Sequence, residues 1–115
     1  MMGGSGSDPL SQLREDFRHQ LELFYARLKL APPYDSVEKA ITRLTADIKA
    51  RSVADQRQVW DDPTARWQAY KAAFVESGLH LKHRGIIAGL AKGGVPPDLP
   101  AEHQAFLDVY ARATS

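Results

Sequence analysis

Residues 10–31 carry the pattern that most constrains the fold. Apolar side chains recur there at intervals of three or four residues, at Leu10, Leu13, Phe17, Leu21, Phe24, Leu28 and Ala31. At about 100° of rotation per residue, these positions form one stripe along an α-helix. Asp8-Pro9 is a plausible cap with proline at the first helical position, and Pro32-Pro33 would stop the helix. The pattern predicts a long first helix that ends at about Ala31.

Capping signals mark the second and third helices. Asp35 and Glu38 have capping-box spacing, with Asp in place of the usual Ser or Thr, before a helix that would end at about Arg51. The core face of this helix would consist of Val37, Ile41, Leu44 and Ile48. Ser52 either caps a separate short helix that reaches Trp60, or lies within a continuation of the second helix.

Proline and glycine divide the second half of the chain. Asp62-Pro63 is typical of a helix start, and Ser77-Gly78 would end that helix through a left-handed C-cap. We expect one more helix over residues 79–91, ending before Gly93-Gly94, and a last helix that begins at Pro100. The apolar faces of the helices after Pro63 and Pro100 would carry Trp67, Tyr70 and Phe74, and Phe106, Leu107 and Tyr110.

These boundaries predict an all-α protein. We expect five or six short helices, joined by proline-marked turns, in a compact irregular or orthogonal bundle. Residues 8–115 would form a single helical domain. Residues 1–7, MMGGSGS, would be a flexible segment outside it, and part of this segment resembles an added linker.

Composition excludes several classes of function. The chain has 115 residues, enough to bury a core without disulfides or metal, and it has no Cys, which rules out thiolate zinc sites and iron–sulfur clusters. No apolar run approaches the roughly 18 residues of a membrane span. The N-terminus lacks the basic-then-apolar order of a signal peptide. We therefore expect a cytoplasmic protein without a membrane partner.

The segment LHLKHRGIIAGLAKGG, residues 79–94, is chemically uneven because it contains basic residues and no acid. Nucleic-acid or anion binding through Lys82, Arg84, Lys92 and His80 is one interpretation. On a continuous helix, however, Lys82 and Arg84 would lie about 160° apart, so no single face would be basic. A solvated helix with its cations in water is the other interpretation, and the sequence favours it.

Histidines and glycines in the same segment raise two further hypotheses. His80 and His83 could share a metal, but neither belongs to an HExxH or paired ExxH motif, so we expect no metal or cofactor. We expect His83 to lie partly buried in the apolar stripe, bonded to a backbone carbonyl. Gly85 and Gly89 would share one side of the helix and admit another backbone, from this chain or from a partner. Each glycine costs about 1 kcal/mol of helix stability relative to alanine, which favours mobility or ordering on binding.

The first helix carries more leucine than one stripe requires. Leu23 and Leu30 would lie about 120° or more from the centre of the stripe. Either the fold covers this helix on two sides, or the two leucines belong to a partner surface. Trp60 and Trp67 could form a binding hot spot, although tryptophan more often anchors a core, and we expect the core role.

No catalytic motif, nucleophile elbow or cofactor loop is present, so we expect no enzyme. The sequence favours a small protein–protein interaction or regulatory module. It would bind a protein partner or self-associate through Leu23, Leu30, Gly85 and Gly89. The alternative is nucleic-acid binding through the acid-free segment.

Overall fold

The computed structural model describes residues 9–93 and 98–113. The predictions for residues 1–8 and for the connection that follows Gly93 lie outside the described residues. Within the described ranges the chain forms helices and no strand, which confirms the all-α class. The elements are α1 (Pro9–Arg27), α2 (Tyr34–Lys49), α3 (Val53–Asp61), α4 (Pro63–Glu76), the 3₁₀ turn η1 (Leu79–Leu81), α5 (Arg84–Gly93), the 3₁₀ turn η2 (Ala101–His103) and α6 (Gln104–Ala113).

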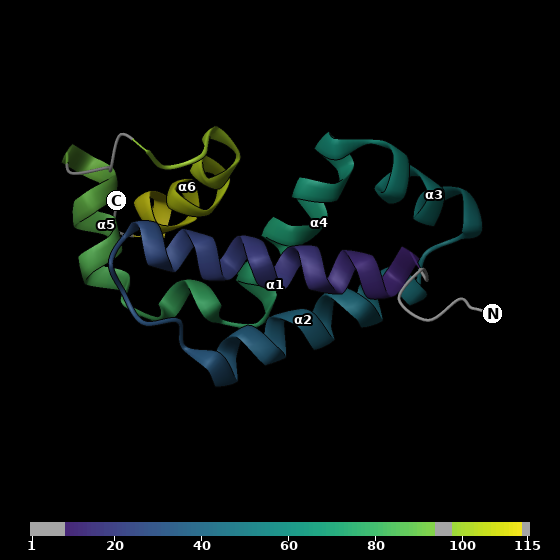
Figure 1. The fold of residues 1–115 in the computed structure, drawn as a ribbon, viewed down its shortest axis with the longest axis horizontal. Helices are drawn as coiled ribbons and strands as arrows, with labels where there is room; N and C mark the ends of the chain where they lie inside the picture. Colours follow the sequence, from purple (N-terminus) through teal and green to yellow (C-terminus); the bar gives the residue numbers. More distant parts are fainter. Residues whose placement is uncertain (1–8, 94–97, 114–115) are drawn as a thin grey trace.

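The helices form an irregular bundle around α1. Figure 1 shows α1 along the long axis of the molecule, with α2 below it, α3 at one end and α5 at the other. Helix α4 packs against both α2 and α3, while α5 packs against α6. The described helices therefore leave α5 at a tip of the molecule, remote from α3.

Aromatic rings from α1, α4 and α6 fill the centre of the bundle. Phe17 stacks on Tyr70 with ring centroids 4.7 Å apart, and Phe74 stacks on Phe106 at the same distance. Phe24 meets both Phe74 and Phe106 edge-on, so it joins the three helices. The predicted stripe of the first helix is buried from Leu13 to Leu28. Such ring pairs contribute about 0.5–1.5 kcal/mol beyond the area they bury.

Two side-chain caps and one left-handed glycine set three of the predicted boundaries. The Ser52 hydroxyl accepts a 3.2 Å hydrogen bond from the amide of Asp55, so the separate short helix is the correct alternative. The Asp62 carboxylate accepts a 3.0 Å bond from the amide of Thr64, at the start of α4. Gly78 has φ 78°, the left-handed conformation predicted for it. The capping box at Asp35 is wrong, because α2 already begins at Tyr34 and its N-cap, Pro33, offers no capping side chain.

Helix α1 ends at Arg27, four residues before the predicted end. Lys29 adopts φ 61°, and its amide donates to the carbonyl of Ala26 at 3.0 Å. The amide of Leu30 reaches back to the carbonyl of Tyr25 at 2.9 Å. These two bonds form a Schellman motif, in which a lysine occupies the position usually held by glycine. The helix therefore ends before Pro32 can stop it.

The helix predicted over residues 79–91 is broken in two. Its first turn is η1, after which Lys82 is extended and His83 adopts φ 56°. The hydroxyl of Tyr110 lies 3.3 Å from the carbonyl oxygen of Leu79 and 3.2 Å from that of Lys82. This tertiary contact occupies carbonyl groups that a continuous helix would bond to its own amides. The chain reverses locally and begins α5 at Arg84.

Candidate interaction surface

Helix α5 has one buried side and one open side. Ile87 and Ala88 are buried, and the helix packs against α6. On the opposite side Ile86, Gly89 and Gly93 are exposed, and helical geometry places them within about 60° of one another. Gly85 is exposed beside them. The outward side of α5 therefore exposes one large apolar side chain, Ile86, among three glycines, with the half-buried Leu90 next to it.

The glycines of α5 face open space. A Cβ atom built on Gly85, Gly89 or Gly93 would meet no atom of the described residues within 4 Å, apart from the adjoining residues and the nearby backbone of α5 itself. No described element approaches Gly85 or Gly89, so among the described residues these glycines do not pack closely against another part of the chain. The alternative considered for these glycines, close approach by a partner, stays a prediction.

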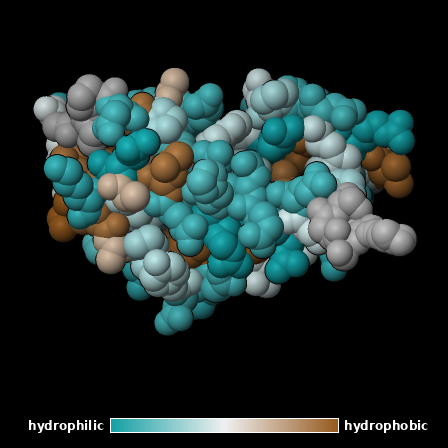
Figure 2. Space-filling model, viewed as in Figure 1, coloured by the Kyte–Doolittle hydropathy of each residue, from teal (hydrophilic) through white to brown (hydrophobic). Residues whose placement is uncertain are grey.

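Two large apolar side chains are exposed at this tip of the molecule. Ile86 is 56% exposed and Leu81, five residues earlier, is 55% exposed. Figure 2 shows apolar surface over α5, interrupted by hydrophilic residues. We call the exposed residues of this region other than His83 the α5 surface. It consists of Leu81, Lys82, Arg84, Gly85, Ile86, Gly89, Lys92 and Gly93.

In the described part of the chain, ion pairs involve three arginines but none of the cations of the α5 surface. Arg18, Arg27 and Arg43 pair with Glu38, Asp98 and Glu76, respectively. The guanidinium of Arg18 lowers the pKa of Glu38 by hydrogen bonding to it. Within residues 9–93 and 98–113, Lys82, Arg84 and Lys92 form no ion pair, and neither do exposed cations elsewhere such as Lys39, Lys49 and Arg57.

The break before α5 changes the predicted distribution of charge. Because η1 and α5 are separate, the angle of about 160° between Lys82 and Arg84 on one helix does not apply. Lys82 lies before α5, Arg84 is its first residue and Lys92 lies in its last turn. Arg84 and Lys92 are about 12 Å apart along the helix axis. Gly85, Ile86 and Gly89 thus lie between two exposed cations along the helix.

The histidines of this region contribute to the local fold. Nε2 of His83 lies 3.3 Å from the carbonyl oxygen of Ala31, so the predicted bond to a backbone carbonyl is present. His83 is nevertheless exposed, and the prediction that it lies in the apolar stripe is wrong. His80 is half-buried. No group of three His, Cys, Asp or Glu side chains in the described part of the chain could hold a metal ion.

The partner surface predicted on the first helix, Leu23 and Leu30, is less exposed than the α5 surface. Leu30 follows α1 rather than belonging to it, and it packs, half-buried, against the core. That position next to a Schellman turn commonly contacts the last turns of the helix, which explains an apolar residue there. Leu23 is also half-buried. Trp60 and Trp67 are half-buried and pack against the core, in line with the expected core role.

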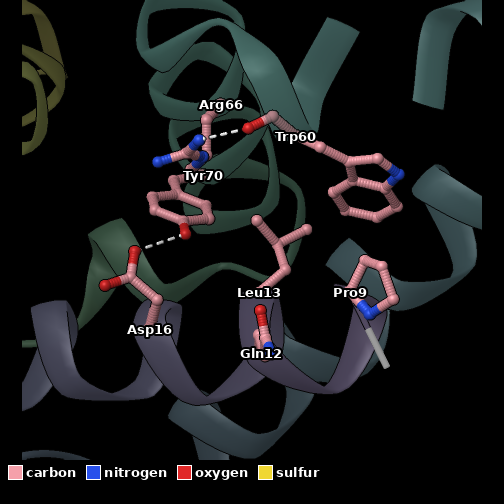
Figure 3. A pocket seen from close by; sticks show the side chains of 7 residues that line it. All are labelled: Pro9, Gln12, Leu13, Asp16, Trp60, Arg66 and Tyr70. Carbon is pink, nitrogen blue, oxygen red and sulfur yellow. Dashed lines mark hydrogen bonds between the residues drawn. The ribbon is translucent and has the colours of Figure 1, made fainter. Parts of the chain in front are cut away.

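A pocket between the start of α1 and the junction of α3 with α4 is a second candidate site. It has a volume of about 220 Å³, and Asp16, Trp60, Arg66 and Tyr70 line it with Pro9, Gln12 and Leu13. Figure 3 shows the Tyr70 hydroxyl directed at the Asp16 carboxylate, 2.6 Å away. Burial, followed by the hydrogen bond to Asp16, raises the pKa of Tyr70. Sequence spacing gave no sign of this pair, because the two residues are far apart in the chain.

The polar groups of this pocket hold the bundle together. Arg66 donates to the carbonyl oxygens of Val59 at 3.2 Å and Trp60 at 2.6 Å, which lie near the end of α3. Asp16 accepts from Tyr70 and, at 3.3 Å, from Gln20. Because its raised pKa keeps Tyr70 protonated near neutral pH, this phenol is a hydrogen-bond donor there and not a base. The arrangement stabilises the junction of α1, α3 and α4.

No protein-family model matches this chain, and neither does any curated protein or solved structure. Among the described helices, none combines the length and apolar character needed to cross a bilayer.

Proposed function

We propose that this protein is a protein–protein interaction module whose partner docks on the α5 surface. One observation carries the proposal. The outward side of α5 exposes Ile86 and three glycines, and apart from adjoining residues and the helix's own backbone no described atom lies within 4 Å of a Cβ built on any of those glycines. A partner on this side would cover apolar surface that the chain leaves in water.

Energetics support a partner at this position. Fully burying an exposed side chain of this kind contributes about 1.5–3 kcal/mol, and covering Ile86 or Leu81, which are a little more than half exposed, would contribute roughly half of that. Helix pairs usually pack with axes about 8–10 Å apart, and the absence of Cβ atoms at Gly85 and Gly89 lets a partner come to the near end of that range. The same glycines disfavour the isolated helix by about 1 kcal/mol each, so contact with a partner would also order α5.

Self-association through the first helix has less support. It requires Leu23 and Leu30 to form an exposed strip, but both are half-buried and Leu30 packs against the core of its own chain.

Nucleic-acid binding also has less support. Lys82, Arg84 and Lys92 are three charges in a chain of net charge +1, and nucleic-acid affinity depends mainly on the number of phosphates neutralised.

Site-specific photo-crosslinking in cells of the source organism tests the proposal. A photoreactive residue replaces Ile86 in one version of the protein and Val53 in a matched control. Val53 is 75% exposed and lies in α3, at the opposite end of the molecule (Figure 1). We expect a defined protein adduct from position 86, identifiable by mass spectrometry, and none from position 53. The same products from both positions, or none from position 86, would show that the α5 surface is not a docking site.

A further inference from the structure

The α5 surface combines exposed apolar side chains with cations that have no counter-charge. Leu81 and Ile86 are more than half exposed, and Lys82, Arg84 and Lys92 form no ion pair within the described ranges. No Asp or Glu occurs between Glu76 and Asp98 in the sequence. A docking surface of this composition is complementary to an apolar strip with acidic flanks.

A second copy of this chain does not supply those acids. Two α5 helices packed antiparallel would bring Arg84 of one copy near Lys92 of the other. Parallel packing would place each cation opposite the same residue of the other copy. Like charges opposed across an interface disfavour it. If the acidic α3 of one copy packed on the α5 of the next, the contact would be head-to-tail. Such a contact produces open chains of molecules unless the rotation between copies closes a ring. These relationships favour a different protein as the occupant.

The shape of the surface favours a helix. Gly85, Gly89 and Gly93 repeat at intervals of four, so the region without side chains follows the axis of α5 for about 12 Å. An amphipathic helix lying along such a face inserts residues spaced by three or four. Its carboxylates would reach Arg84 at one end of α5 and Lys92 at the other.

From this combination, and resting on the proposed function, we infer that the occupant of the α5 surface is an acidic amphipathic helix of another protein. Its apolar strip packs on Leu81, Ile86 and the glycines. Its carboxylates pair with Lys82, Arg84 and Lys92. The contact weakens with added salt, because exposed charges are screened over about 10 Å at 0.1 M ionic strength.

The test uses two designed helical peptides of about 15 residues, near the length at which isolated helices form. Both carry the same strip of Leu and Ala. One has Glu on the flanks, and the other has Gln at the same positions. Each is titrated into the ¹⁵N-labelled full chain at low salt, and shifts of backbone amides report the affinity and the place of binding. A duplex and a single-stranded oligonucleotide are titrated in parallel.

We expect the Glu peptide to shift amides of residues 81–93 and to bind about tenfold more tightly than the Gln peptide, from three exposed ion pairs. Replacing Lys82, Arg84 and Lys92 by Gln should remove that difference. The matched control replaces Lys39, Lys49 and Arg57, exposed on α2 and α3, and loses the same charge. It should preserve the difference.

Several results would overturn the inference. Equal affinity for the two peptides would exclude an acidic partner, and so would absent binding of the Glu peptide or shifts outside the α5 surface. Tighter binding of either oligonucleotide would point to nucleic acid instead. None of these peptide results depends on the crosslinking experiment. An adduct at position 86 with a partner that lacks an acidic helix would leave the proposed function standing and refute the partner chemistry alone.

Discussion

Nε2 of His83 lies 3.3 Å from the carbonyl oxygen of Ala31, and this contact ties the turn before α5 to the turn after α1. His83 holds φ 56°, so α5 starts in a direction that η1 does not continue. The orientation of the α5 surface therefore depends on a residue in an unusual backbone conformation.

Substitutions at His83 should separate the effect of backbone strain on stability from the effect of the hydrogen bond. His83→Gly loses the bond but relieves the left-handed conformation, so we expect a small change in the free energy of unfolding. His83→Val loses the bond and is sterically disfavoured at positive φ, which should cost about 1–2 kcal/mol more. Urea unfolding of both variants measures the difference. Equal stability of the two would mean that the turn does not hold this conformation in solution.

Replacing each of two glycines by alanine should change the stability of the fold in opposite directions. Gly78→Ala places a Cβ at φ 78° and should destabilise the fold by about 1 kcal/mol. Gly89→Ala places a Cβ in open space on a helix and should stabilise it by about 0.5–1 kcal/mol. Thermal unfolding distinguishes these changes. Destabilisation by Gly89→Ala in the isolated protein would show that an element of the chain covers this side of α5.

The Tyr70–Asp16 hydrogen bond should stabilise the junction of α1 with α4. Tyr70→Phe keeps the ring stack on Phe17 but leaves a half-buried carboxylate without its 2.6 Å donor. We expect a loss of about 1–3 kcal/mol in the free energy of unfolding. Tyr34→Phe, at a side chain that is 61% exposed, is the control and should change stability by less than about 0.5 kcal/mol. Similar values for the two variants would argue against this bond.

Buried His103 should make stability depend on pH. Its ring is fully buried, Nε2 lies 2.9 Å from Oε1 of Gln20, and burial lowers its pKa. As the pH falls below about 6.5, the His103 ring is therefore protonated first in the unfolded chain. The folded state loses stability until the pH reaches the lower pKa that His103 has when folded. The contribution of one group is at most about 1.4 kcal/mol per pH unit. Urea unfolding of the wild type and His103→Leu across this range should give curves that converge at low pH. Parallel curves would contradict the shifted pKa.

Helix boundaries that depend on a residue's own side chain could be predicted from the sequence. Ser52 and Asp62 accept bonds from amides two or three positions ahead, and Gly78 needs only its own conformational freedom. Each signal is local. The positions of these three residues therefore carried enough information to place the ends of α3 and α4.

Boundaries without a local sequence signal could not be predicted. Lys29 ends α1 in a conformation for which lysine shows no sequence signal. The break at Lys82 involves the hydroxyl of Tyr110, which is 28 residues away in the chain. Likewise, the spacing of Gly85 and Gly89 predicted that they share one side of a helix, but not that this side faces outward. Its orientation follows from the packing of Ile87 and Ala88 toward α6.

Gly89→Leu tests most directly whether the open side of α5 is a docking surface. A Cβ at position 89 meets no described atom, so the variant should fold with a melting temperature equal to or above that of the wild type. The larger side chain would nevertheless stand where a partner must approach. In the crosslinking experiment with the photoreactive residue at position 86, we predict that Gly89→Leu abolishes the adduct while the fold is kept. An undiminished adduct from the stably folded variant would contradict docking on this face.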